Sequence, residues 1–458
     1  MQHVHFIGIC GTAMGSVAAA MHAKGFKVTG SDENVYPPMS TFLEQQGIEI
    51  FPGYKAENIP ETAEIIVVGN AISRGNEEAE AALERKLLYV SLPEILKEHF
   101  LRGHRNLVVS GTHGKTTTSS MLAWLLKSAG VDPSYMIGGI PRNLGQGAAF
   151  TDSDFVVLEG DEYDTAFFDK RSKFLHYLPE VVVINNIEFD HADIYNSLDE
   201  IKLTFRRLLN IVPRNGMAFV NGDCANSMDV ASNTPAPVQT VGMGGHCDLQ
   251  ITDIDYGREQ TSFVIDGENY VLPMAGEFNV RNAAMAISAA RFSGFDADQI
   301  RQGLASFKGI ARRQEVRGIA GGVRVVDDFA HHPTAIGLAV DSLRQQYPDS
   351  RLWVIFEPRS NTTRRNVFQD ELAAALSKAD LAVVPAVPDP GKVAKEERLD
   401  PEKLVNDVKA AGTECWYRET VDDIVELVAS ESKAGDTVAV LSNGGFGGIH
   451  QKLLDRLA

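Results

Sequence analysis

The chain has 458 residues, of which 44% are hydrophobic and 23% are charged, and its formal net charge is −18. This length exceeds what a single hydrophobic core supports, so the sequence predicts two to four domains. A strongly acidic protein is a poor partner for the phosphate backbone of nucleic acids, which excludes nucleic-acid binding as its main role. The charge still permits nucleotide binding, because backbone amides and a few local cations suffice.

The cysteines and the apolar segments indicate where the protein works. Cys10, Cys224, Cys247 and Cys415 lie far apart in the sequence, which argues against a zinc site or a disulfide framework and fits a reducing cytoplasm. The N-terminus has no Lys or Arg before its first apolar run, so we do not expect a signal peptide. Because every apolar stretch is too short to span a bilayer, we expect no membrane insertion.

The first predicted unit, residues 1–105, alternates short strands with helices. A strand over Val4–Ile9 leads through a glycine-rich turn, Gly8–Gly15, into a helix over Met14–Lys24, and the next strand ends at Asp32. This βαβ pattern places an acidic residue about where a dinucleotide fold contacts a ribose. The second and third glycines of the dinucleotide pattern are absent. Two interpretations therefore stay open: a tight strand–helix turn, or a diphosphate site for a nucleotide other than NAD.

A second glycine-rich turn follows the apolar strand Leu107–Val109 and precedes a helix predicted over Ser119–Lys127. It has the shortened P-loop pattern Gly-x-x-Gly-Lys-Thr, without the further glycine expected at Val109. A strand that turns through glycines into a helix directs N–H groups and the helix dipole at an anion, while the Lys adds charge and the Thr can hold Mg²⁺. Gly-Lys-Thr alone often marks only a helix start, but the flanking strand and helix favour nucleotide binding.

Polar residues follow two further apolar strands of this second unit. The strand Phe155–Glu159 leads to Glu162, and the strand Val181–Ile184 leads to His191. If both strands run parallel to the strand before the glycine loop, their carboxyl ends meet at one edge of the sheet, as Mg²⁺–phosphate chemistry requires. The alternative for such acidic runs is a solvated loop. We favour a metal or phosphate role for Glu162 and His191 because each follows a fully apolar strand.

Downstream segments continue the alternation of predicted strands and helices. Met217–Val220 and three later short strands are expected to form a β-rich excursion, followed by an apolar helix over Phe278–Phe292 that carries Asn279 and Asn282 at its start. Asn279 could simply cap that helix. A third strand–helix alternation begins after Ala311-Arg312-Arg313, and its polar residues again follow strands, in the runs DDFAHHP, EPRSN and SNGGFGG.

Together these signatures resemble the Mur ligase family, whose members use ATP to join amino acids or peptides to UDP-N-acetylmuramic acid in bacterial wall synthesis. The resemblance covers nearly the whole chain and rests on the first glycine-rich turn and on the runs GTHGKTTT, EGDEYD, NIEFDHAD, ARR and DDFAHHPT. It implies an α/β fold of three domains. Residues 1–105 would form a Rossmann-like UDP-sugar-binding domain, residues 106–311 a P-loop-type ATP-binding domain, and residues 312–458 a Rossmann-like domain for the amine substrate.

Within the family, the chain is most similar to the two members that accept UDP-N-acetylmuramate itself. One adds L-alanine in de novo synthesis, and the other adds the recycled tripeptide L-alanyl-γ-D-glutamyl-meso-diaminopimelate. The runs NVYPPMST, EYDTAFFDKRSKFLHY, EPRSNTTRR and SNGGFGGIHQKLL resemble the recycling member. One departure concerns a lysine that several members carry in carbamylated form. Phe205 occupies the aligned position, with Lys202 nearby, so a carbamate bridge is not assumed.

The resemblance implies a two-step reaction with ATP and Mg²⁺: the lactyl carboxylate attacks the γ-phosphate of ATP, and the peptide amine then displaces phosphate from the acyl phosphate. Lys115, Glu162 and His191 would be catalytic, and Thr116, Glu162 and His191 would position Mg²⁺. The implied nucleotide-binding residues are Gly111, Thr112, His113, Gly114, Lys115, Thr116, Thr117, Asn282, Arg313 and His331. Those for the other substrates are Gly11, Thr12, Met14, Asp32 and Ser73, together with Arg359, whose guanidinium suits a peptide carboxylate.

The expected partners are therefore UDP-N-acetylmuramate and a murein tripeptide. We expect no nucleic acid, no membrane insertion, a cytoplasmic location, and a monomer or weak homo-oligomer. Two alternatives remain: the alanine-adding ligase on the same fold, and a non-catalytic, regulatory nucleotide-binding protein.

Overall fold

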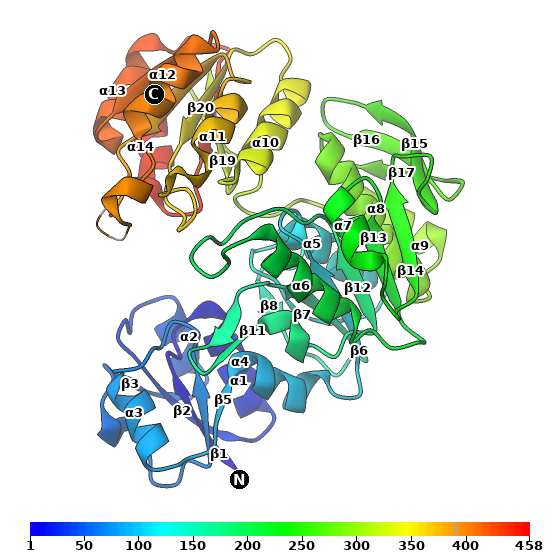
Figure 1. Ribbon diagram of the computed structural model, residues 1–458, viewed down its shortest axis with the longest axis vertical. Helices are drawn as coiled ribbons and strands as arrows, with labels where there is room; N and C mark the ends of the chain where they lie inside the picture. Colours follow the sequence, from blue (N-terminus) through cyan, green and yellow to red (C-terminus); the bar gives the residue numbers. More distant parts are fainter. Residues whose placement is uncertain (390, 392) are drawn as a thin grey trace.

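The computed structural model describes residues 1–389, 391 and 393–458. In Figure 1 the chain forms three α/β units in a row, with the first (blue) and the third (yellow to red) at opposite ends and the second (cyan to green) between them. This arrangement confirms the predicted three-domain α/β class. In the part of the chain that the structure describes, no helix has the length and apolar character needed to cross a membrane.

The first unit is a five-stranded parallel sheet in the order β3-β2-β1-β4-β5. The order reverses between β1 and β4, and ligands of open α/β sheets bind at the carboxyl ends of strands beside such a switch point. The glycine-rich turn after β1 lies there. The elements are β1 (His3–Ile7), β2 (Lys27–Asp32), β3 (Glu49–Pro52), β4 (Ile65–Val68), β5 (Tyr89–Ser91), α1 (Thr12–Ala23), α2 (Met39–Gln45), α3 (Glu77–Glu84) and α4 (Leu92–Leu96).

The second unit is built on a ten-stranded sheet in the order β17-β16-β15-β14-β13-β12-β6-β9-β7-β8. Its strands are β6 (Arg105–Ser110), β7 (Ser134–Met136), β8 (Ala148–Ala149), β9 (Phe155–Gly160), β12 (Val181–Ile184), β13 (Met217–Asn221), β14 (Val238–Gly242), β15 (Leu249–Tyr256), β16 (Thr261–Ile265) and β17 (Glu268–Leu272). Its helices are α5 (Lys115–Ser128), α6 (Leu198–Leu209), α7 (Ala225–Ala231), α8 (Glu277–Phe292) and α9 (Ala297–Ala305).

Strands β6, β9 and β12 are parallel neighbours, as predicted, so their carboxyl ends share one edge. Two other expectations were wrong. The Met217–Val220 segment is not part of a separate excursion, because β13 pairs parallel to β12 inside the main sheet. The helix after the glycine loop begins at Lys115 and not at Ser119. The run of Thr and Ser residues obscured this start, since these residues have low helix propensity.

A two-stranded hairpin, β10 (Asp164–Ala166) and β11 (Asp169–Ser172), leaves the second unit and reaches the first. At its tip Phe168 packs edge-on against Tyr89 of β5, with ring centroids 4.8 Å apart. Phe167 and Phe168 together join the apolar cluster on the α3 face of the first sheet. The sequence did not reveal the hairpin, because its strands are short and mostly polar.

The third unit is a six-stranded sheet in the order β18-β19-β23-β20-β21-β22, parallel apart from β18. Its strands are β18 (Glu315–Ala320), β19 (Val323–Asp328), β20 (Leu352–Phe356), β21 (Leu381–Pro385), β22 (Glu414–Arg418) and β23 (Thr437–Leu441). Its helices are α10 (Pro333–Gln346), α11 (Gln369–Leu376), α12 (Pro401–Ala410), α13 (Val421–Glu431) and α14 (Ile449–Leu457).

The central strands of the three large sheets, such as β4, β12 and β20, are buried throughout, which explains why they are continuously apolar. In β20, Val354 and Phe356 pack under α10, α11 and α12, while Trp353 and Ile355 pack under α13 and α14. Burial of each such side chain contributes about 1.5–3 kcal/mol, so the strand ends are held rigidly. The polar residues at these ends are therefore fixed in space, as a catalytic site requires.

Candidate active site

The glycine loop joins β6 to α5 and is shaped by two positive backbone angles. Gly111 has φ 131° and Gly114, the N-cap of α5, has φ 81°. A Cβ atom at Gly114 would collide with the side-chain amide of Asn282 and lie 2.8 Å from Nδ2 of Asn185. Glycine is thus needed here both for its conformation and for the close approach of α8. The uncapped N-terminus of α5 directs its first N–H groups towards the adjacent cavity.

Lys115 lies at the centre of this loop. Its ammonium group donates to the carbonyl oxygens of Gly111 at 2.7 Å and Thr112 at 3.3 Å. The same group contacts both carboxylate oxygens of Glu162, at 3.0 and 2.8 Å. Lys115 thereby connects the end of β6 with the loop that follows β9.

Glu162 in turn pairs with His191. Nε2 of His191 lies 3.0 Å from Oε1 of Glu162, and the Glu162 side chain is only 3% exposed. The backbone carbonyl of Glu162 accepts hydrogen bonds from the hydroxyl groups of Ser172 and Tyr195, each at 2.7 Å. Glu162 is therefore fixed at both its backbone and its carboxylate, and the structure brings together Lys115, Glu162 and His191.

The three side chains of this group shift one another's pKa values. Burial opposes ionisation of Glu162, but Lys115 and His191 outweigh it and lower the pKa of the carboxyl group. Burial also opposes the charge on Lys115, yet Glu162 outweighs it and raises the pKa of the ammonium group. In the same way, Glu162 raises the pKa of His191 against the effect of burial. The site thus places a buried carboxylate between Lys115 and His191, next to the glycine loop.

Two further carboxylates belong to the same edge. Glu159 accepts from the Thr116 hydroxyl at 3.0 Å and from the Gly138 N–H at 2.7 Å. Asp161 stands beside Glu162 and pairs with Lys173 at 2.8 Å. Sequence reasoning singles out only Glu162 of this run, although the whole acidic run at the end of an apolar strand is visible in the sequence.

The donor set at this edge fits a divalent cation. Ligand atoms of Asp161, Glu162 and His191 lie within 4.8 Å of one another and combine carboxylate oxygens with an imidazole nitrogen. The predicted third ligand, Thr116, donates its hydroxyl to Glu159 and accepts from Arg313 at 3.3 Å. Asp161 is a further candidate donor that the sequence reasoning did not single out.

A cavity of about 540 Å³ opens beside these residues, between the second and third units. Its walls include the glycine loop, the strand ends and the start of α8, together with the loop before α10. Of the predicted nucleotide-binding residues, those on its lining are Thr112, His113, Gly114, Lys115, Thr116, Thr117, Asn282, Arg313 and His331. Gly111 lies just behind, against the backbone of Asn185 and Asn186.

Helix α8 presents Asn282 to this cavity. The side chain is buried, and its Nδ2 has no hydrogen-bond partner among the described residues. An unpaired buried donor is costly, and a ligand acceptor in the cavity would satisfy it. Asn279 is not the N-cap of α8, because Gly276 occupies that place and the Asn279 amide donates to the carbonyl of Ala275 at 2.7 Å.

The two adjacent arginines point to different places. Arg313 donates to Thr116 beside the glycine loop, and burial lowers the pKa of its guanidinium. Arg312 donates to the carbonyl oxygens of Ser442 and Gly444 in the third unit, both at 2.7 Å. Both guanidinium groups lie over the ring of Phe329, at 4.7 Å for Arg313 and 5.2 Å for Arg312.

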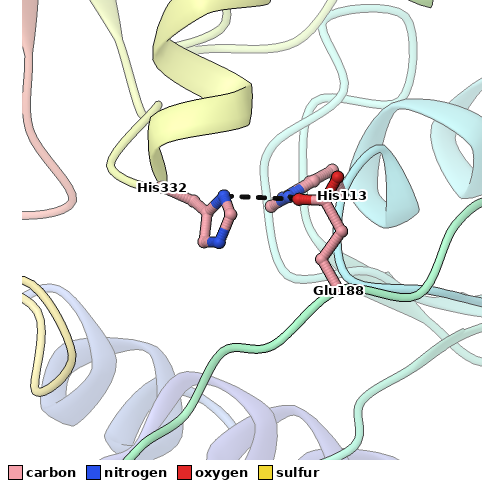
Figure 2. A group of neighbouring side chains, drawn as sticks. All are labelled: His113, Glu188 and His332. Carbon is pink, nitrogen blue, oxygen red and sulfur yellow. Dashed lines mark hydrogen bonds and ion pairs between the residues drawn. The ribbon is translucent and has the colours of Figure 1, made fainter. Parts of the chain in front are cut away.

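Three residues from distant segments meet at the seam between the second and third units, as Figure 2 shows. His113 of the glycine loop lies 2.9 Å from Glu188, and Nδ1 of His332 lies 3.5 Å from the same oxygen. His332 also caps α10 by accepting from the Thr334 N–H, and its other nitrogen bonds the Phe189 carbonyl at 3.1 Å. Both of its ring nitrogens therefore have protein partners, and the cluster joins the two units.

The predicted residues of the first unit surround its glycine-rich turn. Asp32 accepts from the N–H groups of Cys10 and Asn34, both at 2.9 Å, so its carboxylate holds the turn in shape. Met14 is buried beneath the turn in the apolar core. Gly11, Thr12 and Ser73 are exposed at the carboxyl edge of the sheet.

The predicted peptide residue Arg359 follows β20 in the third unit. It is about half exposed and lies 3.9 Å from Glu357, with its side chain packed over the backbone of Gly444. Among the described residues Arg359 does not line the 540 Å³ cavity. It is separate from the group around Lys115.

The position of the carbamylated lysine is filled by a core residue. Phe205 is fully buried against Phe174, with ring centroids 5.6 Å apart. Lys202, one turn earlier on α6, pairs with Asp229 at 3.1 Å. The Glu162–His191 pair is thus built without a lysine from this helix.

Comparison with known proteins gives one family in all three units. Residues 3–104 match the model "Mur ligase family, catalytic domain", residues 109–290 the "Mur ligase middle domain", and residues 312–444 the "Mur ligase, glutamate ligase domain". The chain is 41% identical to a UDP-N-acetylmuramate–L-alanyl-γ-D-glutamyl-meso-2,6-diaminoheptandioate ligase of Escherichia coli, over 100% of this chain and 98% of that protein.

Two further proteins are similar to this chain at lower identity. A UDP-N-acetylmuramate–L-alanine ligase of a Psychrobacter strain is 32% identical, over 99% of this chain and 95% of its own length. A crystal structure of a murein peptide ligase from Psychrobacter arcticus superposes with a TM-score of 0.73 at 36% identity, covering 100% of this chain and 99% of the other.

Proposed function

The chain belongs to the Mur ligase family, and we propose that it joins L-alanyl-γ-D-glutamyl-meso-diaminopimelate to UDP-N-acetylmuramate with hydrolysis of ATP to ADP. The observation that carries this function is the 41% identity over the full length to the Escherichia coli tripeptide ligase, against 32% to an alanine ligase. The reaction returns a recovered wall peptide to a nucleotide-linked precursor, which is a step of peptidoglycan recycling.

The chemistry begins with two anions that must meet. A carboxylate is a poor electrophile, so the lactyl carboxylate of the sugar nucleotide first attacks the γ-phosphate of ATP and becomes an acyl phosphate. Lys115 and the N-terminus of α5 offset the charge of the transferring phosphoryl group. The peptide amine then attacks the acyl carbon, and inorganic phosphate leaves.

The carboxylates and histidine around Lys115 fit a magnesium ion. Glu162, His191 and Asp161 would hold it, with Thr116 through water, and it would neutralise phosphate charge during transfer. The chain's own contribution is to fix these donors: Ser172 and Tyr195 hold Glu162 through its backbone carbonyl.

We assign the nucleotide to the cavity beside the glycine loop. The unpaired amide of Asn282 supports a contact to the base, and Arg313 near Thr116 supports a contact to the phosphates. His331 lines the same cavity from the third unit. Burial lowers the pKa of His331, so it offers a neutral imidazole.

We assign the sugar nucleotide to residues 1–105, the ATP to residues 106–311 and the peptide to residues 312–458. Gly11, Thr12, Met14, Asp32 and Ser73 would form or support the sugar-nucleotide site at the carboxyl edge of the first sheet. Arg359 would bind a peptide carboxylate, because a guanidinium at a strand end matches a carboxylate bidentately. If so, Arg359→Ala weakens peptide binding more than ATP binding, and a loss confined to ATP would contradict the assignment.

The deciding experiment supplies UDP-N-acetylmuramate and ATP with either the tripeptide or L-alanine, and measures ADP and the nucleotide product. Efficient turnover with the tripeptide supports the proposal. Turnover with alanine and none with the tripeptide would identify the de novo alanine-adding ligase instead. Absence of substrate-dependent phosphate release with both amines would favour a non-catalytic nucleotide-binding protein.

We further propose a cytoplasmic enzyme that acts as a monomer or weak homo-oligomer, without nucleic acid. The net charge of −18 supports the absence of a nucleic-acid partner. The four free cysteines support a reducing compartment, and gel filtration with light scattering would measure the oligomeric state.

A further inference from the structure

The loop that carries His191 is docked onto the third unit. The Thr362 hydroxyl donates to Oδ1 of Asp190 at 2.9 Å and accepts from the Ala192 N–H at 3.3 Å. One residue earlier, the Asn361 amide donates to Asp193 at 2.8 Å. Thr362 is 2% exposed and Asp190 is 6% exposed, so water cannot easily replace this contact.

The same Asp190 oxygen holds the backbone of the neighbouring histidine. It accepts the N–H of His191 at 2.7 Å, and His191 adopts a left-handed conformation with φ 54°. A non-glycine residue keeps such a conformation only where its surroundings impose it. From His191 the polar chain continues to Glu162 and Lys115. A continuous series of bonds therefore runs from Thr362 to the glycine loop.

The loop that carries Thr362 is closed by other side chains, so the Thr362 hydroxyl is available for this contact. Ser360 and Thr363 bond each other through their hydroxyls at 2.8 Å and through the Thr363 N–H at 3.0 Å. Thr363 is also buried, but its hydroxyl stays within the loop that begins at Arg359. Two adjacent threonines thus have different tasks: Thr363 closes the loop, and Thr362 bonds the second unit.

We propose that Thr362 is a positioning residue that makes the placement of His191 depend on docking of the third unit. The inference rests on the proposed function and deepens it. The loop that follows Arg359 belongs to the unit assigned to the peptide. Through Thr362 it would set the geometry of His191 and Glu162, which support phosphoryl transfer. Activation of the lactyl carboxylate would then be favoured when the unit that supplies the amine is in place, which limits wasteful hydrolysis of the acyl phosphate.

The test separates Thr362 from Thr363. Thr362→Val and Thr362→Ala remove the hydroxyl, Thr362→Ser keeps it, and Thr363→Val is the matched control. The first half-reaction is measured without peptide, by trapping the acyl phosphate with hydroxylamine: the hydroxylamine nitrogen attacks the acyl carbon, phosphate leaves, and the hydroxamate and ADP are quantified. Binding of Mn²⁺ with ADP is measured separately by electron paramagnetic resonance.

We expect Thr362→Val and Thr362→Ala to slow hydroxamate formation by about 10- to 100-fold, as misplacement of a catalytic group does, and to weaken Mn²⁺ binding. Thr362→Ser should restore both, while Thr363→Val should raise the KM for the peptide and leave both nearly unchanged. A Thr362→Val protein that matches wild type in the two measurements, or that loses no more than Thr363→Val, overturns the proposal. If wild type itself forms no hydroxamate, the proposed function fails, and the Mn²⁺ measurement still decides on Thr362.

Discussion

The two glycine-rich turns of this protein share a backbone arrangement but differ in the charged side chains beside them. Each follows a parallel strand and enters a helix whose N-cap is a glycine, Gly11 for α1 and Gly114 for α5. Glycine has no side chain to cap the first N–H groups, so both helices can present them to an anion. In the second turn, the first helical residue is Lys115, and Glu162 and His191 stand behind it. In the first turn, the carboxylate of Asp32 accepts a hydrogen bond from the turn's own backbone.

This difference separates binding from chemistry. A turn with amides and a helix dipole suffices to hold a diphosphate that does not react. Transfer of a phosphoryl group also needs cations and a metal-binding carboxylate, because negative charge must be offset while bonds change. The first turn therefore suits a diphosphate that only anchors a substrate. The second turn suits the phosphates that take part in the reaction.

The sharpest test of the comparison removes the lysine of the second turn. Lys115→Met should lower turnover by roughly 1,000-fold, since loss of one donor to a developing charge costs about 10²–10³ in rate. It also leaves Glu162 buried without its main cation, so the melting temperature should fall. Binding of UDP-N-acetylmuramate, measured by calorimetry, should stay near wild type. A variant that keeps most of its turnover would show that the two turns do not differ as argued.

The matching change in the first turn is Asp32→Asn. An amide offers one acceptor oxygen where the carboxylate offers two, so either the Cys10 or the Asn34 N–H loses its partner. Leaving a buried donor unsatisfied costs about 1–3 kcal/mol, which corresponds to roughly 10- to 100-fold weaker binding of the sugar nucleotide. The affinity for ADP should not change. Equal losses for both ligands would mean that Asp32 acts on the whole protein and not on this turn.

Sequence reasoning succeeded where apolar patterns and strand ends coincide. The apolar strand of β12 was predicted with its observed bounds, and the shared edge of β6, β9 and β12 followed from it. The location of Lys115, Glu162 and His191 at that edge could be anticipated for the same reason. The hydrophobic pattern reveals the bounds of such a strand, because a strand buried on both faces is continuously apolar and the first polar residues mark its end.

Long-range contacts were beyond the reach of the sequence. Nothing local marks Thr362 as a partner of Asp190, or Asp161 as a neighbour of both Glu162 and His191. The run EYDTAFFDKRSKFLHY resembles the recycling member, which adds the tripeptide, and its hairpin contacts the first unit. Such pairings depend on how whole units pack, which short patterns do not encode.

The hairpin offers a smaller test, because it connects the two units that carry the turns. Its base adjoins Glu162 and its tip packs beside Tyr89 in the first unit. Phe168→Ala removes an aromatic pair worth about 0.5–1.5 kcal/mol, so the KM for UDP-N-acetylmuramate should rise by about 2- to 12-fold. The KM for ATP is the internal control. Phe167→Leu keeps apolar bulk at the tip and should have a weaker effect; a shift in the ATP KM instead would place the hairpin with the second turn.

The smallest expected effect on turnover at neutral pH concerns His332, which ties the second turn to the third unit through Glu188. Burial lowers the pKa of His332 to about 4, from 6.5. As the pH falls from 6.5 towards 4, His332 is therefore protonated in the unfolded chain but not in the folded chain. This difference favours unfolding, so stability that is present above pH 6.5 is lost in that range.

His332→Asn tests this, because asparagine can still cap α10 but does not titrate. Wild type should lose about 2 kcal/mol more of its unfolding free energy than the variant between pH 7.5 and pH 5, measured by urea denaturation. His113 and Glu188 face His332, so their titration changes with it, and the difference between the two proteins reports this cluster of three side chains. Parallel pH profiles would show that the imidazole takes up its proton in the folded protein as readily as in the unfolded chain, so that at pH 5 an ion pair with Glu188 holds the seam beside His113.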